Sequence, residues 1–285
     1  GARPFRFPRF PLIGEPDFAP GTPAHWQAGL LAMLVAALVL YPLQRGLLTT
    51  VLAGTLLFCF LDVNCLQPWV WLYVLIFVVA LFSPTSRTDR NPSLTPIAWL
   101  LAAVYAWGGF HKLTPYFAED NFSWFCESFS FTKSLGQYSA LGYAVALLEM
   151  SFAAGLLWSR TRRFFRNLVI GFHIVILAAL SPWGHDWNAV VLPWNLAMTA
   201  LVWVAFPTGE DLQILKTGKY PLPIAFVIVL AWLAPALNIF GYWPHTLSWQ
   251  LYTNTQPEGT FFADQQIHFK TQQGEELWLE FTKGE

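Results

Sequence analysis

The chain has 285 residues, of which 55% are hydrophobic and only 12% are charged, and it contains 15 tryptophans and 25 phenylalanines. A soluble domain carries about 25% charged residues, so this composition predicts an integral membrane protein surrounded by lipid. The formal net charge of -1 excludes a nucleic-acid partner from the expected functions, because binding a phosphate backbone requires a basic surface.

The middle of the chain is predicted to be a multi-pass membrane domain. Residues 1–24 are rich in Pro, Arg and Phe and are expected to form a surface arm. Residues 25–240 contain a series of apolar runs close to the roughly 20 residues that span a bilayer. The fold class is therefore an all-α bundle of about eight transmembrane helices. The runs are centred on 26–43, 46–63, 68–83, 94–112, 138–158, 165–182, 189–206 and 221–240.

Basic residues are concentrated in one of the two sets of loops that connect these runs. This set consists of residues 44–45, 84–93, 159–164 and 207–220. The opposite short loops contain almost nothing basic except Lys133. The positive-inside rule therefore predicts that the first set is cytoplasmic and that both termini are extracytoplasmic, although three arginines in the N-terminal arm oppose this orientation.

The C-terminal segment 241–285 is predicted to be an extracytoplasmic tail. Its stretch TFFADQQIHFKTQQGEELWLEF alternates apolar and polar residues around a turn at QQGE, which is typical of a two-stranded β-hairpin. An isolated hairpin is only marginally stable, so we expect the tail to lie on the outer face of the bundle.

Lys112 is the most unusual residue of the membrane domain, because it ends the uncharged run LTPIAWLLAAVYAWGGF within WGGFHKLTPYF. A lysine at membrane depth costs about 2.5 kcal/mol or more, so such residues usually face a cavity or a partner. Burial of an amine favours its neutral form, which is a competent base. Alternatively, the flexible stem of Lys112 carries the ammonium to the membrane surface, since Pro115 ends the helix there.

Two further polar residues are predicted to lie deep in the bilayer. Glu149, in GYAVALLEMSFAAGLLW, has no basic residue in its own helix. It is either a functional group or a protonated structural group bonded to a neighbouring helix. His173, in LVIGFHIVILAAL, is a packing residue more often than a ligand in such a setting, unless Glu149 is its partner.

The remaining polar residues of interest are predicted at or near the outer helix ends. His185 lies in a loop framed by tryptophans, which an interfacial aromatic belt would also explain. Oxidising conditions on this side would permit a disulfide between Cys65 and Cys126, but the cysteine spacing predicts no metal site. The polar set is Asp62, Asn64, His111, Lys112, Glu119, Asp120, His185 and Asp186.

The sequence contains no nucleophile elbow, phosphate loop, HExxH motif or dinucleotide fingerprint. An enzyme built from this chain would have a buried amine, a few carboxylates and histidines, and a lipophilic cavity. Those groups suit a substrate dissolved in the membrane, such as a quinol.

Five short segments occur in the order FLDVN, WGGFHKLTPYF, ALLEMSFAAGLLW, GFHIVI and GYWPHTLSWQLYTN. They resemble segments of vitamin K-dependent gamma-carboxylase and, more broadly, the HTTM domains of bacteria. The corresponding carboxylase segments are Phe-Met-Asp-Ala-Asn, an aromatic-small-Gly run leading into Lys-Lys-Leu-Asp, Leu-Leu-Leu-Asp-Leu-Ser-Ala-Gly-Phe-Leu-Leu, Tyr-Phe-His-Cys-Met and Gly-Leu-Tyr-Gly-Tyr-Ser-Trp-Asp-Met-Met. An alternating segment with a QGE-like turn follows in both.

The resemblance implies a short member of this family in the bacterial inner membrane, with its active site on the periplasmic side. By motif position, Lys112 corresponds to the base that deprotonates the hydroquinone of vitamin K. Oxygenation of that quinone gives a strong base that removes a proton from a glutamate side chain. His111 stands where the family has the first lysine of its pair.

The chain departs from the eukaryotic carboxylase in two respects. That enzyme is far longer and has a large lumenal region that grips its protein substrate, whereas the outer segment here is the tail 241–285. Its Asn-His pair, which precedes the Asp-Ala-Asn segment and is used near the quinone, has no counterpart in the stretch QRGLLT.

Two hypotheses follow, and the sequence favours the first. The first is a quinol-linked oxidoreductase or carboxylase-like lyase that uses a reduced quinone. The second is a non-catalytic subunit or scaffold that binds a protein partner at the extracytoplasmic face. A transporter fits less well, because no inverted repeat is evident. For the enzyme, the predicted catalytic residues are Lys112, His111 and Glu149, and the predicted substrate-binding residues are Asp62, Asn64, Trp107, His173 and His185.

Overall fold

The chain divides into two compact units, Gly1–Asn254 and Thr255–Glu285. The first unit contains the helices and the second contains a pair of short strands. The computed structural model describes residues 44–61, 65–83, 94–187, 191–208, 220–251, 253, 267–270 and 276–279.

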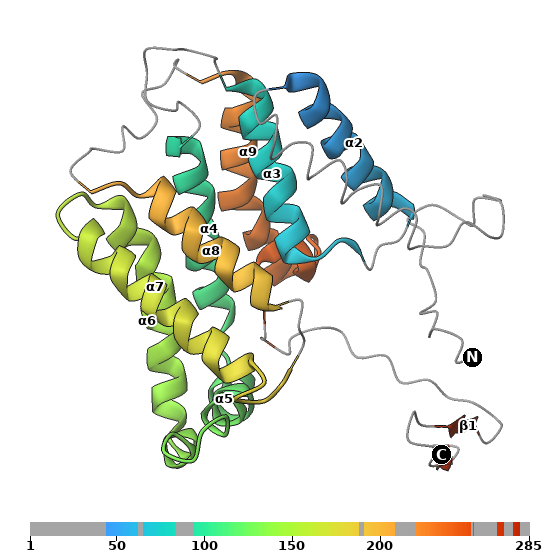
Figure 1. The fold of residues 1–285 in the computed structure, drawn as a ribbon, viewed down its shortest axis with the longest axis vertical. Helices are drawn as coiled ribbons and strands as arrows, with labels where there is room; N and C mark the ends of the chain where they lie inside the picture. Colours follow the sequence, from blue (N-terminus) through green and yellow to red (C-terminus); the bar gives the residue numbers. More distant parts are fainter. Residues whose placement is uncertain are drawn as a thin grey trace. The chain divides into compact units, whose positions relative to one another are not determined.

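Seven long α-helices make up most of the described part of the first unit (Figure 1). They are α2 (Arg45–Leu61), α3 (Pro68–Phe82), α4 (Leu94–His111), α6 (Ser139–Leu157), α7 (Arg162–Leu180), α8 (Val191–Ala205) and α9 (Leu222–Leu233). The short elements are the π-helix η2 (Phe117–Asn121), α5 (Phe122–Cys126) and the 3-10 helices η3 (Lys133–Gln137), η4 (Ala234–Phe240) and η5 (His245–Ser248). Each long helix coincides with one predicted span, and the remaining predicted span, 26–43, lies outside the described residues.

Three helical segments of the described chain are long and apolar enough to cross a membrane. They are Ser139–Leu157, Arg162–Leu180 and Leu222–Phe240, the last of which combines α9 with η4. Helices α2, α3 and α8 are apolar but shorter. This helical, apolar architecture indicates a membrane-associated protein.

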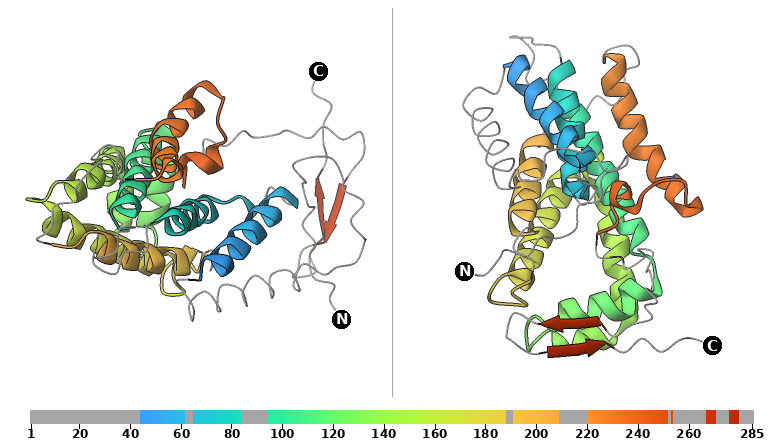
Figure 2. Two further views of the ribbon diagram at one scale, coloured as in Figure 1. Left: turned by 90° about the horizontal axis from the view of Figure 1, so that it is seen from above. Right: turned by 90° about the vertical axis from the view of Figure 1, so that its right-hand side faces the viewer.

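Helix α4 is the centre of the helical unit, because it contacts α3, α6, α8 and α9. Figure 1 shows α6 and α7 on one side of α4, with α2 and α3 on the other, and Figure 2 shows α2 and α3 side by side from another direction. A helix that is apolar on all faces is expected to be surrounded by protein, and Leu100 and Leu101 of α4 are completely buried. They belong to one core with Leu72, Phe152 and Met198.

Proline residues set the beginnings of two of these helices. Pro68 occupies the first turn of α3, and Pro223 occupies the first turn of α9. A proline is well tolerated there because its missing N–H would have no partner within the helix. The helices therefore start where the sequence first offers proline followed by an apolar run.

Arginines satisfy the carbonyl groups at the ends of three helices. Arg45 Nη2 donates to Ser83 O, at the end of α3, over 3.2 Å. Arg162 Nε donates to Leu156 O, at the end of α6, over 2.9 Å. Arg166 Nη1 donates to Phe206 O, just beyond α8, over 3.4 Å. A cation at a helix C-terminus also complements the helix dipole, so these basic residues have a structural role, which Arg45 and Arg162 combine with their predicted role in orientation.

The second unit contains β1 (Ile267–Lys270) and β2 (Glu276–Leu279), which pair antiparallel with Ile267 opposite Leu279 and Lys270 opposite Glu276. These strands fall within the stretch in which the sequence predicts a hairpin. The predicted start of the tail, at residue 241, differs from the division between the two units, because residues 241–251 contact the helices. Trp249 is 1% exposed in the hydrophobic core of the first unit.

The contact between α4 and α6 depends on glycine at position 109. A Cβ atom at Gly109 would lie 2.3 Å from Met150 N and 2.6 Å from Ala146 O, which are backbone atoms and cannot move aside. We expect Gly109→Ala to destabilise the protein by about 1–3 kcal/mol or more, as overpacking of a core does. Thermal unfolding in detergent micelles, followed by tryptophan fluorescence, measures this effect.

Gly171→Ala in α7 is the matched control, because nothing lies within 4 Å of a Cβ at Gly171. This substitution should leave the protein unchanged or stabilise it by about 0.4–1 kcal/mol through the unfolded chain. Equal unfolding temperatures for the two variants would contradict the close approach of α4 and α6.

Candidate functional site

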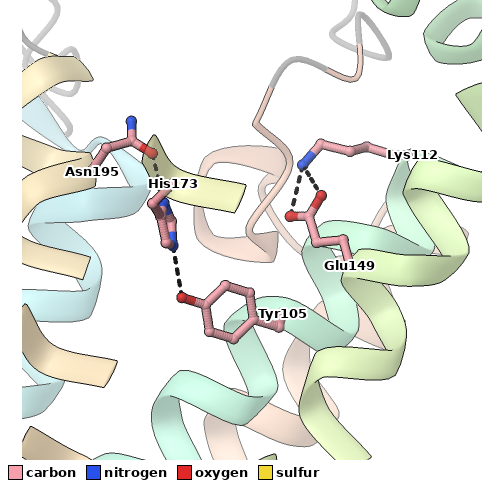
Figure 3. A network of polar contacts seen from close by, with 5 residues as sticks. All are labelled: Tyr105, Lys112, Glu149, His173 and Asn195. Carbon is pink, nitrogen blue, oxygen red and sulfur yellow. Dashed lines mark hydrogen bonds and ion pairs between the residues drawn. The ribbon is translucent and has the colours of Figure 1, made fainter. Parts of the chain in front are cut away.

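Lys112 and Glu149 form an ion pair where α4 ends against the middle of α6 (Figure 3). Lys112 Nζ donates to Glu149 Oε1 over 2.8 Å and to Glu149 Oε2 over 2.6 Å. Gly108 allows this geometry, since a Cβ there would lie 3.0 Å from Glu149 Oε1. The glycine pair 108–109 therefore brings the two helices close enough for a side chain on each to meet.

The ion pair is buried. Lys112 is 8% exposed and Glu149 is 7% exposed. The Lys112 amine also lies 5.8 Å from the centre of the Phe117 ring, which belongs to the π-helix η2. An aromatic face attracts a cation at this distance, and single π-turns occur frequently at functional sites. Lys112 therefore points into the protein, and it is not an anchor that carries its charge to the membrane surface.

His111 lies in a second polar network, which joins the end of α4 to the segment after α9. Gln250 Nε2 lies 3.2 Å from His111 Nδ1 and also donates to Asn238 Oδ1. Asn238 Nδ2 in turn donates to Trp243 O over 2.6 Å. The His111 ring stacks on Trp107, with ring centres 5.6 Å apart. Residues 238–250 thus cover the end of α4 beside the ion pair.

The directions of these hydrogen bonds assign the His111 tautomer. Trp243 O can only accept, so the amide nitrogen of Asn238 faces Trp243 and its oxygen faces Gln250. Gln250 must then present its amide nitrogen, which donates to both Asn238 and His111. His111 Nδ1 is therefore an acceptor, and the hydrogen of the neutral ring lies on Nε2.

Tyr105, His173 and Asn195 form a third network, which links α4, α7 and α8 (Figure 3). Asn195 Nδ2 donates to Val191 O over 2.9 Å, so Asn195 Oδ1 accepts from His173 Nδ1 over 2.7 Å. His173 Nε2 then accepts the hydroxyl hydrogen of Tyr105 over 2.8 Å. Each side-chain polar atom in this series of three residues has a hydrogen-bond partner. The partners of His173 are Tyr105 and Asn195, whereas the sequence had suggested Glu149 as a possible partner.

The other predicted site residues have roles apart from the ion pair itself, or lie outside the described part of the chain. His185 Nε2 lies 2.6 Å from Trp124 O, and its ring stacks on Trp124 with ring centres 4.1 Å apart, so it fixes the α7–α8 loop against α5. Trp107 donates from Nε1 to Trp232 O over 3.0 Å, which links α4 to α9. Asp62 and Asn64 lie outside the described residues.

The acidic residues Glu119 and Asp120 of η2 are exposed and do not join the ion pair. Cys59 and Cys126 are free thiols, and burial raises the pKa of the Cys126 thiol. No group of three or more His, Cys, Asp or Glu side chains in the described chain has an arrangement that could hold a metal ion. The described site contains an ion pair, an imidazole and aromatic rings.

Sequence reasoning missed four members of these networks: Tyr105, Asn195, Asn238 and Gln250. Asn195 had a usable signal, because it is the only strongly polar residue of α8 in the run VLPWNLAMTALVWVA. Gln250 follows the predicted membrane domain and was assigned to the tail, so nothing in the sequence connected it to His111.

No family model, curated protein or solved structure matches the chain. Function must therefore be inferred from the arrangement of the buried polar side chains.

Removal of one member of the ion pair should be far more harmful than removal of both. Lys112→Met leaves the Glu149 carboxylate buried without its cation, and we expect a loss of about 3–5 kcal/mol in unfolding free energy. The double variant Lys112→Met/Glu149→Leu places apolar side chains of similar volume in the same space and should recover most of this loss. Thermal unfolding of the single and double variants in detergent measures the difference, and a double variant as unstable as the single one would contradict the burial of the pair.

The Tyr105 hydroxyl should contribute to stability because it is the donor to a buried imidazole nitrogen. Tyr105→Phe leaves His173 Nε2 without a donor and is expected to cost about 1–3 kcal/mol. Tyr143→Phe in α6, at a partly exposed position, is the matched control and should change the unfolding temperature little. Equal effects of the two substitutions would show that the Tyr105–His173 hydrogen bond is absent.

Proposed function

We propose that this protein is a membrane enzyme resembling vitamin K-dependent gamma-carboxylase, an oxidoreductase or lyase that acts on a quinol or another lipophilic hydroxyl compound. Lys112 is the general base of the proposed reaction. The observation that supports the proposal is the buried contact between Lys112 Nζ and both oxygens of the Glu149 carboxylate. Ionisable pairs at such depth are costly in a membrane and typically mark functional sites.

Glu149 has a defined role in this proposal, because an ammonium group has no lone pair with which to accept a proton. Transfer of one proton from Lys112 Nζ to Glu149 Oε2, across 2.6 Å, converts the ion pair into a neutral amine and a neutral carboxylic acid. The two hydrogen bonds between the groups give this proton a direct path. Glu149 thus prepares Lys112 to act as a base.

The neutral amine of Lys112 then takes the proton of the substrate hydroxyl. The products are a lysine ammonium and a substrate oxyanion in contact, while Glu149 remains protonated. Because Glu149 is then uncharged, it does not repel the oxyanion, and the ammonium stabilises the new negative charge in a site of low polarity. A lipophilic substrate reaches such a site from the bilayer.

The surroundings of the pair agree with a flat aromatic ligand. Trp107, Phe110 and His111 form a cluster of rings at the end of α4, with centres 5.4–5.6 Å apart. Asp62 and Asn64 lie outside the described part of the chain, and we retain them as proposed substrate-binding residues. In this proposal a reduced quinone is the cofactor, and the protein lies in the bacterial inner membrane with both termini extracytoplasmic.

The alternative is a non-catalytic membrane subunit that holds a protein partner at its extracytoplasmic face. The tight packing beside Glu149 favours this candidate, because Gly109 leaves no room for a methyl group against the backbone of α6. The Tyr105–His173–Asn195 chain is likewise satisfied internally. For such a subunit the ion pair would serve only to hold α4 and α6 together.

The two candidates differ in what the double variant Lys112→Met/Glu149→Leu should do. The enzyme should lose at least about 100-fold in turnover, since general base catalysis contributes about 10²–10⁴. The measurement is oxygen-dependent oxidation of 2-methyl-1,4-naphthohydroquinone by the purified protein in liposomes, with thermal unfolding as the check on folding.

Lys133→Met is the matched control, because Lys133 is an exposed lysine in η3. It should retain the turnover of the original protein. A folded double variant with full turnover would exclude Lys112 as the base. Absence of turnover in the original protein, with a partner retained through detergent extraction, would favour the subunit.

A further inference from the structure

His111 carries a buried hydrogen-bond donor that the described protein does not use. Its Nε2 atom is buried and has no hydrogen-bond partner among the described residues. The residue is 8% exposed, so water outside the protein does not reach it freely. The bonds from Trp243 O through Asn238 and Gln250 place the ring hydrogen on this nitrogen. The free atom is therefore an N–H group that requires an acceptor.

The protein holds this N–H in a fixed position. Gln250 fixes one side of the ring at Nδ1, and Trp107 stacks on its face with an interplanar angle of 28°. A side chain that served only to fill space would not need its tautomer assigned by a chain of three polar residues. A rigid donor without an internal acceptor is the arrangement expected for a group that binds an external oxygen.

The donor lies at the same end of α4 as the ion pair. His111 precedes Lys112 directly, and the segment that holds His111 also reaches Gly108, where Trp249 O lies 3.7 Å from the position of a Cβ. Glu149 Oε1 lies 3.0 Å from that same position. Trp249 has a second buried N–H without a partner among the described residues, so this region contains two unsatisfied donors.

We propose that His111 Nε2 donates a hydrogen bond to an oxygen atom of the ligand that binds beside the Lys112–Glu149 pair, and that His111 is thereby the residue that positions this oxygen. The ligand is a lipophilic ring compound that carries a carbonyl or hydroxyl oxygen. Toward His111 this oxygen acts only as a hydrogen-bond acceptor. This inference rests on the proposed function for its choice of a quinone as the probe. A fixed donor beside the base would select the oxygen that faces Lys112.

A matched pair of substitutions at His111 isolates the donor. His111→Gln places an amide N–H close to the position of the imidazole Nε2, whereas His111→Met has similar length and no donor. Both variants lose the ring and the acceptor for Gln250, so any cost to folding is shared. His245→Phe in η5 is the control for loss of an unrelated histidine.

Binding is measured on the full chain in lipid nanodiscs with 2,3-dimethyl-1,4-naphthoquinone, with 2,3-dimethylnaphthalene as the probe that lacks oxygen. We expect His111→Met to bind the quinone about tenfold more weakly than His111→Gln, which is the size of one hydrogen bond. The two variants should bind the hydrocarbon equally, and His245→Phe should bind both probes as the original protein does. In ¹⁵N spectra of histidine-labelled protein, saturating quinone should shift the Nε2 resonance of His111.

Equal quinone affinity of His111→Gln and His111→Met would overturn the proposal. An Nε2 resonance that quinone leaves unchanged would also overturn it, because the acceptor would then be a buried water instead of the ligand. A protein that binds the quinone no better than the hydrocarbon would overturn it as well. Quinol turnover in the same preparations separates this inference from the proposed function. If the protein turns over quinol but His111→Gln and His111→Met bind the quinone equally, only the role of His111 is refuted. If the two variants differ tenfold in quinone affinity but the protein shows no quinol turnover, only the reaction is refuted.

Discussion

The contact between Lys112 and Glu149 is the interaction on which the helical unit is arranged. Burial of two opposite charges is least costly when each lies within hydrogen-bond distance of the other, as Lys112 Nζ and the Glu149 carboxylate do. The backbones of α4 and α6 also approach each other closely at this end of α4. Gly108 and Gly109 provide the contact. Once α4 and α6 are fixed, α8 and α9 pack against the other faces of α4, and residues 238–250 fold over its end.

The three buried polar networks differ in completeness, and this difference separates structural groups from candidate ligand-binding groups. The Tyr105–His173–Asn195 chain ends at a backbone carbonyl and has no unused atom, so it joins helices without inviting a ligand. The His111 network ends in an N–H without an acceptor among the described residues. In a protein interior a polar atom without a partner is unfavourable, and the ligand oxygen that we propose would supply the acceptor that this N–H lacks.

The sequence was sufficient to predict the seven long helices of the described chain, because their apolar runs are long and are bounded by proline or by charged residues. It also identified Lys112 and Glu149 as unusual, since each is a charged residue in an apolar run. It could not show that they meet, because a pairing between two helices depends on their rotation and depth. The partners of His173 and His111 were missed for the same reason: Tyr105 and Gln250 are ordinary residues in sequence and gain significance only from the histidine that they contact.

The position of Lys112 at the end of its helix also has a consequence for the order of synthesis. Glu149 follows Lys112 by 37 residues, so the lysine leaves the ribosome before its counter-ion is synthesised. Near a helix end, the long side chain can extend its charge to polar surroundings during this interval, whereas at the centre of an apolar helix it could not. The arrival of α6 then draws the ammonium inward. The same lysine can therefore remain solvated in the nascent chain and become a buried cation in the finished protein.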